Sequence, residues 1–209
     1  MDKLEKKEQF ICLNLKSFLA SGEKIGSGEN RLEKTLSAFS CPKNPDVEDF
    51  LHHNAIDFTK KQQSVTYLVF SAEDMDLVGY FAITMKPVVI QADEMSNATK
   101  RKLGRLSRYD EKTNGYTVAA YLIAQLGKNY SSNIKQRITG KSLMALALQE
   151  LQKIQYSLGG LVVYLECEDK VALLQFYQEQ NGFLRFGERI TENPGETEPH
   201  RLIQLMNFL

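Results

Sequence analysis

A strand, a helix and a second strand follow one another in the second half of the chain, and this succession constrains the fold most. The stretch YTVAAYLIAQL, residues 116–126, is almost continuously apolar, which is typical of a strand covered on both faces. An apolar helical pattern follows over residues 136–151, and GGLVVYLECED, residues 159–169, indicates another buried strand. Because two strands joined through a helix usually run parallel in one sheet, the sequence predicts an α/β fold.

Further patterns add strands and helices to this unit. Residues 64–74 and 75–90 predict an antiparallel hairpin that turns around Glu73–Asp76, and helix-start signals precede an amphipathic pattern over residues 44–63. The other predicted elements are short helices around residues 96–105 and 171–180 and strands over residues 181–190 and 200–209. Together they predict a central mixed sheet flanked by helices.

The first part of the chain differs from the rest. Ser21–Asn30 combines glycines, serines and charges, which is typical of a loop. We therefore expect residues 1–38 to form an N-terminal extension, with short helices beside a Gly/Ser-rich loop, and residues 39–209 to form one domain.

Composition excludes several classes of protein. The 209 residues carry a formal net charge of zero and 43% are hydrophobic, so we expect a packed core and not a chain coated in nucleic acid. No apolar run approaches the ~20 residues that span a bilayer, and we expect no membrane contact. Three cysteines and three histidines lack metal-ligand spacing, which predicts a metal-free, cytoplasmic protein with buried free thiols.

The segment before the crossover helix has the features of a phosphate cradle. Arg137 to Ser142 is basic, contains Gly140 and lies where a helix begins. Helix N-termini offer unpaired N–H groups and the positive end of the helix dipole to anions, and a glycine lets a phosphate approach the backbone. Neither the P-loop spacing nor GxGxxG is present. The alternative is a helix cap beside solvated charges.

Four stretches resemble a known family. Arg137-x-x-Gly140-x-Ser142 resembles the pyrophosphate loop (Q/R)-x-x-G-x-(G/A) of the GNAT, or Gcn5-related, N-acetyltransferases. LLQFYQEQNGF (residues 173–183) and LVGYFAITM (residues 77–85) resemble two other segments of that family. FSCPKNPDVEDFLHHNA, residues 39–55, resembles the entry segment of its bacterial toxin-like branch. The resemblance covers residues 39–209 and implies the GNAT fold, with a mostly antiparallel sheet that splays at the acyl-CoA site.

This resemblance implies a function and its residues. It implies an N-acetyltransferase in which a primary amine attacks the thioester of the co-substrate acetyl-CoA, and in which the Tyr177 hydroxyl protonates the leaving thiolate. Pantetheine is implied to bond the backbone of Leu126, Gly127 and Lys128, and pyrophosphate that of Arg137, Ile138, Thr139, Gly140, Lys141 and Ser142. The general base is not identified; Glu166 and Glu168 are candidates.

The spacing after Tyr177 departs from the family pattern. Four residues separate Tyr177 from Gly182, where three are usual. The extra residue either lies in the turn after the helix or rotates the helix by about 100°, which would turn Phe176 inward in place of Tyr177.

The acceptor and the partners stay open. The acceptor is the amine of a small molecule, a peptide or an aminoacyl-tRNA. With aminoacyl-tRNA as the acceptor, the protein would be a toxin-like enzyme that blocks translation, and an antitoxin is then a candidate partner. The basic run Thr99–Arg108 is either a solvated helix face or a surface for RNA. A homodimer is another candidate assembly. A third hypothesis is a GNAT-like module that binds acyl-CoA without turnover.

Overall fold

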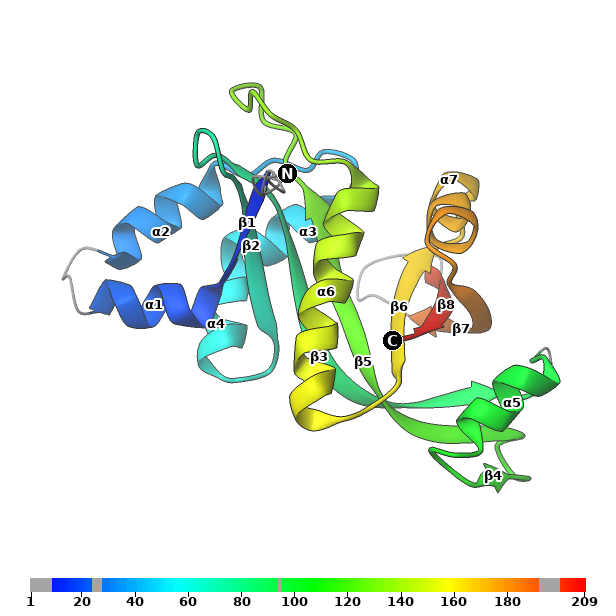
Figure 1. Ribbon diagram of the computed structural model, residues 1–209. Coiled ribbons are helices and arrows are strands. Elements are labelled where there is room, and N and C mark those ends of the chain that lie inside the picture. The colour runs from blue at the N-terminus through cyan, green and yellow to red at the C-terminus, as the bar shows by residue number, and fades with distance from the viewer. Residues whose placement is uncertain (1–8, 24–27, 94, 192–199) are drawn as a thin grey trace, which may run out of the picture. The chain divides into compact units, whose positions relative to one another are not determined.

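The computed structural model describes residues 9–23, 28–93, 95–191 and 200–209 (Figure 1). Eight strands follow the hydrogen-bonded order β1-β2-β3-β5-β6-β8-β7, with β4 paired to β5. The β5–β6 pair is parallel, whereas β1–β2, β2–β3, β4–β5, β6–β8 and β7–β8 are antiparallel. The predicted mixed, mostly antiparallel sheet with flanking helices is therefore confirmed.

The strands are β1 (Phe10–Asn14), β2 (Val65–Ser71), β3 (Leu77–Gln91), β4 (Tyr109–Asp110), β5 (Gly115–Lys128), β6 (Val162–Glu168), β7 (Leu184–Thr191) and β8 (His200–Phe208). The helices are α1 (Leu15–Glu23), α2 (Gly28–Ser37), α3 (Pro45–Asp49), α4 (Ala55–Lys60), α5 (Asn97–Leu103), α6 (Gly140–Leu158) and α7 (Val171–Leu174), with π-helices η1 (Phe50–Asn54) and η2 (Gln175–Gln180).

The chain divides into two compact units. The first comprises Met1–Ile83 and Gln125–Ala147, and the second comprises Thr84–Ala124 and Leu148–Leu209. Consequently β3, β5 and α6 each contribute residues to both units.

In the first unit, helices cover a core that β1, β2 and the start of β3 share. Leu15, Leu36, Leu51 and Tyr80 are fully or almost fully buried in this core. The Asn44 side chain accepts the N–H of Val47 and starts the helical segment α3-η1-α4, which occupies most of the single helix predicted over residues 44–63. Helices α1 and α2 lie side by side (Figure 1).

The first 38 residues contribute to the sheet. β1 pairs antiparallel with β2 from Phe10↔Ser71 to Asn14↔Tyr67, a strand that the sequence did not predict. The loop expected over Ser21–Asn30 is wrong for residues 21–23 and 28–30, which belong to helices α1 and α2, and residues 24–27 lie outside the described residues. A domain boundary at residue 38 stays a prediction.

The second unit has its own apolar cluster. Ile90, Leu103, Ala120, Val162 and Met206, all buried, pack together in it. Thr99 N–H bonds the Ser96 hydroxyl, which caps the start of α5 near the predicted position. β4 pairs with the start of β5 at Tyr109↔Tyr116 and Asp110↔Gly115.

Candidate functional site

The last three residues of β5 are the ones predicted to run beside pantetheine. Leu126 and Lys128 are half-buried, whereas Gly127 is buried. A Cβ added at Gly127 would lie 2.4 Å from Val47 Cγ1 and 3.1 Å from Tyr80 Cε1. The packing of the first unit therefore requires a glycine here. This reason for the glycine differs from the predicted one, which was a close approach of the backbone to pantetheine. The pantetheine role of the three residues stays a prediction.

The predicted cradle coincides with the N-terminus of α6. Thr139 caps this helix: its Oγ1 accepts the Ser142 N–H at 3.0 Å and lies 2.8 Å from the Ser142 hydroxyl. Ile138 is buried, whereas Lys141 is exposed. Among the described residues, no acceptor bonds the N–H of Gly140 or Lys141. These two amides are thus unpaired donors at the positive end of a 19-residue helix.

Side chains on either side of the cradle hold the loop that leads to it. Arg137 Nη2 donates to the carbonyl of Ser131 at 3.1 Å and to that of Tyr130 at 3.4 Å. The Ser71 hydroxyl donates to Gln136 Oε1 at 2.9 Å. Arg137 therefore anchors the loop that leads to the cradle.

Asn129 fixes the other end of this loop, directly after β5. It is 4% exposed, and its Nδ2 donates to the Leu77 carbonyl at 2.7 Å. Its Oδ1 accepts the N–H of Ser40 at 3.0 Å and of Ser131 at 2.9 Å. Sequence reasoning missed this residue; the available signal was a short polar side chain immediately after a buried strand.

Two lysines flank one aromatic ring in the same loop. Lys43 Nζ lies 5.1 Å from the centroid of the Tyr130 ring, and Lys128 Nζ lies 5.3 Å from it. Neither ammonium forms an ion pair with a described residue. Together with Arg137 they make this part of the first unit locally cationic, although the whole chain is neutral.

Tyr177 belongs to the second unit and lies in the π-helix η2. Its ring contacts the rings of Phe176 and Phe183, with centroids 4.9 and 6.2 Å away. A π-turn accommodates one more residue than an α-turn does. The extra residue that the sequence indicated is therefore absorbed within the helix, which neither predicted alternative described.

The Tyr177 hydroxyl is suited to stay protonated. Burial, followed by the neighbouring Cys167, raises the pKa of Tyr177 far above its ordinary value. Burial also raises the pKa of Cys167 to about 11, so this thiol is protonated at neutral pH and is no activated nucleophile. A buried free thiol at Cys167 is as predicted.

The two carboxylates on β6 that are candidate bases already bond other side chains. Glu166 accepts from Gln204 Nε2 at 2.8 Å and from Arg189 Nη1 at 3.0 Å. Glu168 pairs with Lys170 at 2.6 Å. The structure thus gives no reason to prefer either carboxylate as a base.

The second half of β6 is paired with another strand along one edge, among the described residues. β6 pairs with β5 at Tyr121↔Val163 and Leu122↔Tyr164. From Leu165 to Glu168, its only strand partner among the described residues is β8. The backbone groups on its other side are therefore free of strand pairing there.

The predicted basic run is exposed. Arg101, Lys102, Arg105 and Arg108 are exposed, and Lys100 is half-buried. Within the part of the chain that the structure describes, none of the five forms an ion pair. Lys102 Nζ instead lies 4.5 Å from the ring centroid of Phe208.

The described residues lack both a metal-binding cluster and a membrane-spanning helix. They contain no group of three or more histidine, cysteine or acidic side chains that is arranged to hold a metal ion. No helix among them is long and apolar enough to cross a membrane.

Comparison with known proteins identifies the fold. No model of a protein family matches the sequence, and a search of curated proteins found no match. Among solved structures, a KacT variant with one tyrosine replaced by phenylalanine has a TM-score of 0.57 at 13% identity, over 95% of each chain.

Two further structures resemble the chain at 13% identity. AtaTR bound with AcCoA has a TM-score of 0.56 and covers 96% of this chain and 93% of that one. AtaT complexed with acetyl-methionyl-tRNAfMet has a TM-score of 0.55 and covers 80% and 85%. The protein therefore has the fold of the GNAT acetyltransferases, as its sequence motifs predicted.

Proposed function

We propose that the protein is an N-acetyltransferase that moves an acetyl group from acetyl-CoA to a primary amine. The observation that carries this proposal is the start of α6, where the amides of Gly140 and Lys141 are unpaired and Arg137 adds positive charge. The likeness to AtaTR bound with AcCoA supports the choice of ligand.

The residues present fit the phosphates of acetyl-CoA. The unpaired N–H groups offer hydrogen bonds to an anion, and the Arg137 and Lys141 side chains offer countercharge. Gly140 adds no Cβ that would keep a phosphate from the backbone. Acetyl-CoA supplies the activated acyl group as a thioester.

The proposed chemistry is a direct transfer. The lone pair of the neutral amine forms a bond to the thioester carbonyl carbon, and the carbon–sulfur bond breaks. The Tyr177 hydroxyl gives its proton to the leaving thiolate, and a base or water takes the proton that the amine loses. The raised pKa of Tyr177 keeps this donor protonated before the reaction.

Two measurements test this function together. We expect the protein to bind acetyl-CoA in a calorimetric titration and to release free thiol when a panel of primary amines is added. Binding without thiol release from any amine, aminoacyl-tRNA included, would favour the non-catalytic acyl-CoA module. Absence of binding would reject both.

A second candidate narrows the acceptor to aminoacyl-tRNA. The basic side chains of residues 100–108 are mainly exposed and form no ion pair with described residues, as a phosphate-binding surface requires. The likeness to AtaT complexed with acetyl-methionyl-tRNAfMet supports this reading. An antitoxin partner, a homodimer and a cytoplasmic location remain predictions that accompany it.

A further inference from the structure

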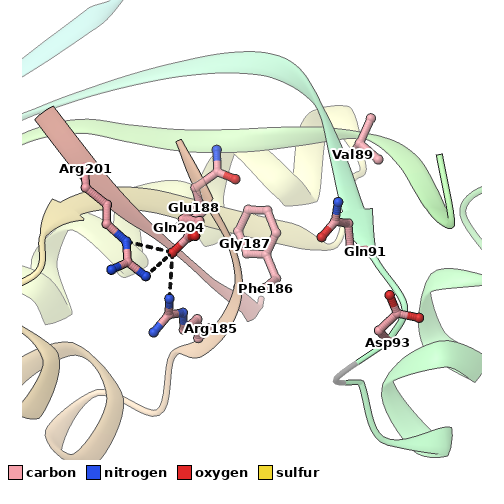
Figure 2. A pocket seen from close by; sticks show the side chains of 9 residues that line it. All are labelled: Val89, Gln91, Asp93, Arg185, Phe186, Gly187, Glu188, Arg201 and Gln204. Atoms are coloured by element: carbon pink, nitrogen blue, oxygen red, sulfur yellow. Dashed lines mark hydrogen bonds and ion pairs between the residues drawn. The ribbon is translucent and has the colours of Figure 1, made fainter. Parts of the chain in front are cut away.

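A cavity of about 560 Å³ lies within the second unit, between the last part of β3 and the β7–β8 pair. This volume is in the range of small-ligand sites. Its lining residues are Val89, Gln91, Asp93, Arg185, Phe186, Gly187, Glu188, Arg201 and Gln204 (Figure 2). The proposed transfer uses none of them.

A β-bulge shapes one side of the cavity. The pairing of β7 with β8 shifts register between Arg185 and Gly187, which leaves Phe186 as an extra residue. In a regular strand, Arg185 and Phe186 would face opposite sides of the sheet. Here both residues line the cavity, and bulges of this kind are common next to functional sites.

The wall formed by β7 and β8 carries two arginine side chains. Glu188 Oε2 accepts Arg185 Nη2 at 2.9 Å and Arg201 Nε at 2.8 Å. The hydrogen bonds and charge of Arg201, with Arg185, lower the pKa of Glu188, which therefore stays ionised. The two guanidinium groups share the Glu188 carboxylate, and Arg201 Nη1 also lies 3.6 Å from Asp169 Oδ2, so Arg185 is the arginine with donor groups left for a ligand. Arg185 is 39% exposed and uses only Nη2 in this contact.

The opposite wall carries a negative charge. Figure 2 shows Asp93 and Gln91 on the other side of the cavity from Arg185. Asp93 Oδ2 accepts Asn114 Nδ2 at 2.5 Å, which orients the exposed carboxylate. A ligand that fills the cavity therefore meets a cation at one end and an anion at the other.

β8 also presents an oriented amide among the residues that line the cavity. Gln204 Nε2 donates to Glu166 Oε1 at 2.8 Å, which sets the orientation of the amide. A Cβ at Gly187 would lie 2.8 Å from Gln204 Oε1, so the glycine makes room for this oxygen. Gln204 Oε1 has no donor among the described residues and is free to accept an N–H of a ligand.

We propose that this cavity binds a short peptide segment that carries one cationic and one acidic side chain. The cationic side chain lies at Asp93, the acidic side chain lies at Arg185, and a backbone N–H donates to Gln204. A simple anion matches the cavity poorly, because Asp93 and Glu188 also line it. The inference does not depend on acetyl transfer.

The test is a titration of the full ¹⁵N-labelled chain, monitored by NMR, with the blocked tripeptide acetyl-Lys-Gly-Glu-amide. Two matched peptides replace either lysine by norleucine or glutamate by glutamine. The protein variants are Asp93→Asn and Arg185→Gln, with Arg108→Gln as a control for an exposed arginine that does not line the cavity.

We expect saturable shifts at Gln91, Gly187 and Gln204. Asp93→Asn should weaken binding of the lysine peptide about fivefold but leave binding of the norleucine peptide unchanged, since an exposed ion pair contributes that much at most. Arg185→Gln should weaken binding of the glutamate peptide about fivefold and leave binding of the glutamine peptide unchanged. Arg108→Gln should leave the affinity for every peptide unchanged.

Three results would overturn the proposal. One is the absence of shifts at these positions at about 10 mM peptide, a concentration that would reveal a dissociation constant in the millimolar range. Another is an equal loss for charged and uncharged peptides in either variant. The third is that inorganic phosphate alone reproduces the shifts and competes with the tripeptide, which would make the cavity a plain anion site.

Discussion

The backbone N–H of Phe183 donates to the carbonyl oxygen of Tyr177, six residues earlier, at 3.0 Å. The usual Schellman closure of an α-helix joins residues five apart. Gly182, with φ of +70°, takes the left-handed position of this wider closure, and its N–H bonds the Gln178 carbonyl at 3.0 Å. The Asn181 side chain also satisfies the Phe176 carbonyl. The carbonyls of Phe176, Tyr177 and Gln178 are thus bonded at the end of the helix despite the extra residue.

Deletion of Glu179 tests whether that residue is dispensable. Glu179 is exposed in η2, and its removal should convert the π-turn into an ordinary α-turn while Tyr177 stays anchored by the preceding helix. We expect the free energy of unfolding to change by less than about 1 kcal/mol. The control is deletion of Gln149 in α6, which rotates the following residues by about 100° and removes Leu151 from the core. A similar loss of stability in both deletions would show that η2 needs its extra residue.

Tyr177→Phe separates the hydroxyl from the ring. The ring contacts with Phe176 and Phe183 remain, so packing and affinity for acetyl-CoA should be retained. Turnover should fall about 10²-fold if the hydroxyl is the proton donor. Because the pKa of Tyr177 is raised, the parent should show no loss of activity from tyrosine ionisation up to at least pH ~10. Unchanged turnover in the variant would assign the proton to water.

Tyr80→Phe probes the core of the first unit. The Tyr80 hydroxyl donates to the Val47 carbonyl at 2.5 Å, and we expect its loss to cost about 1 kcal/mol in urea unfolding at pH 7. Burial raises the pKa of Tyr80, so above pH ~10 the unfolded chain ionises this group while the folded chain does not. Stability of the parent should therefore fall as pH rises through ~10, and Tyr80→Phe should reduce this fall. An identical pH dependence in both proteins would contradict the assignment.

Charge reversal tests the basic segment. Lys100→Glu, Arg101→Glu and Arg105→Glu together should abolish tRNA retention at low salt, and the parent's log affinity should fall linearly with log salt concentration. The matched control reverses Lys16, Lys34 and Lys61 in the first unit, which changes net charge equally. Equal loss in the two triple variants would indicate unspecific attraction. No tRNA retention by the parent would remove the aminoacyl-tRNA proposal and leave other amines open.

The buried elements were the ones that the sequence predicted well. The apolar run at residues 116–126 became β5, and the apolar pattern from Gln136 became α6, because long continuous or 3.6-periodic patterns leave few alternatives. β1 was missed because its five half-buried residues show no alternation, and only pairing with β2 makes them a strand.

Tertiary contacts decided the remaining features. Gly127 is explained by Val47, which is distant in sequence, and Asn129 by bonds to Leu77 and Ser40. The sequence indicated one extra residue after Tyr177 but not the π-turn itself, because no residue type in the sequence marks the hydrogen bonds of a π-turn. The cavity beside β7 could not be predicted because its lining residues come from β3 and the residues after it, from β7 and from β8, which only the tertiary structure brings together.

Binding of acetyl-CoA to Gly140→Glu tests the central claim most directly. A glutamate here places a carboxylate and a Cβ where the account puts a phosphate against the unpaired amides of α6. Ala145→Glu, at an exposed position of the same helix, adds the same charge away from the cradle. In calorimetric titrations of folded proteins, we predict that the parent and Ala145→Glu bind acetyl-CoA alike and that Gly140→Glu binds at least about 100-fold more weakly. Parent-like binding by Gly140→Glu would contradict the account.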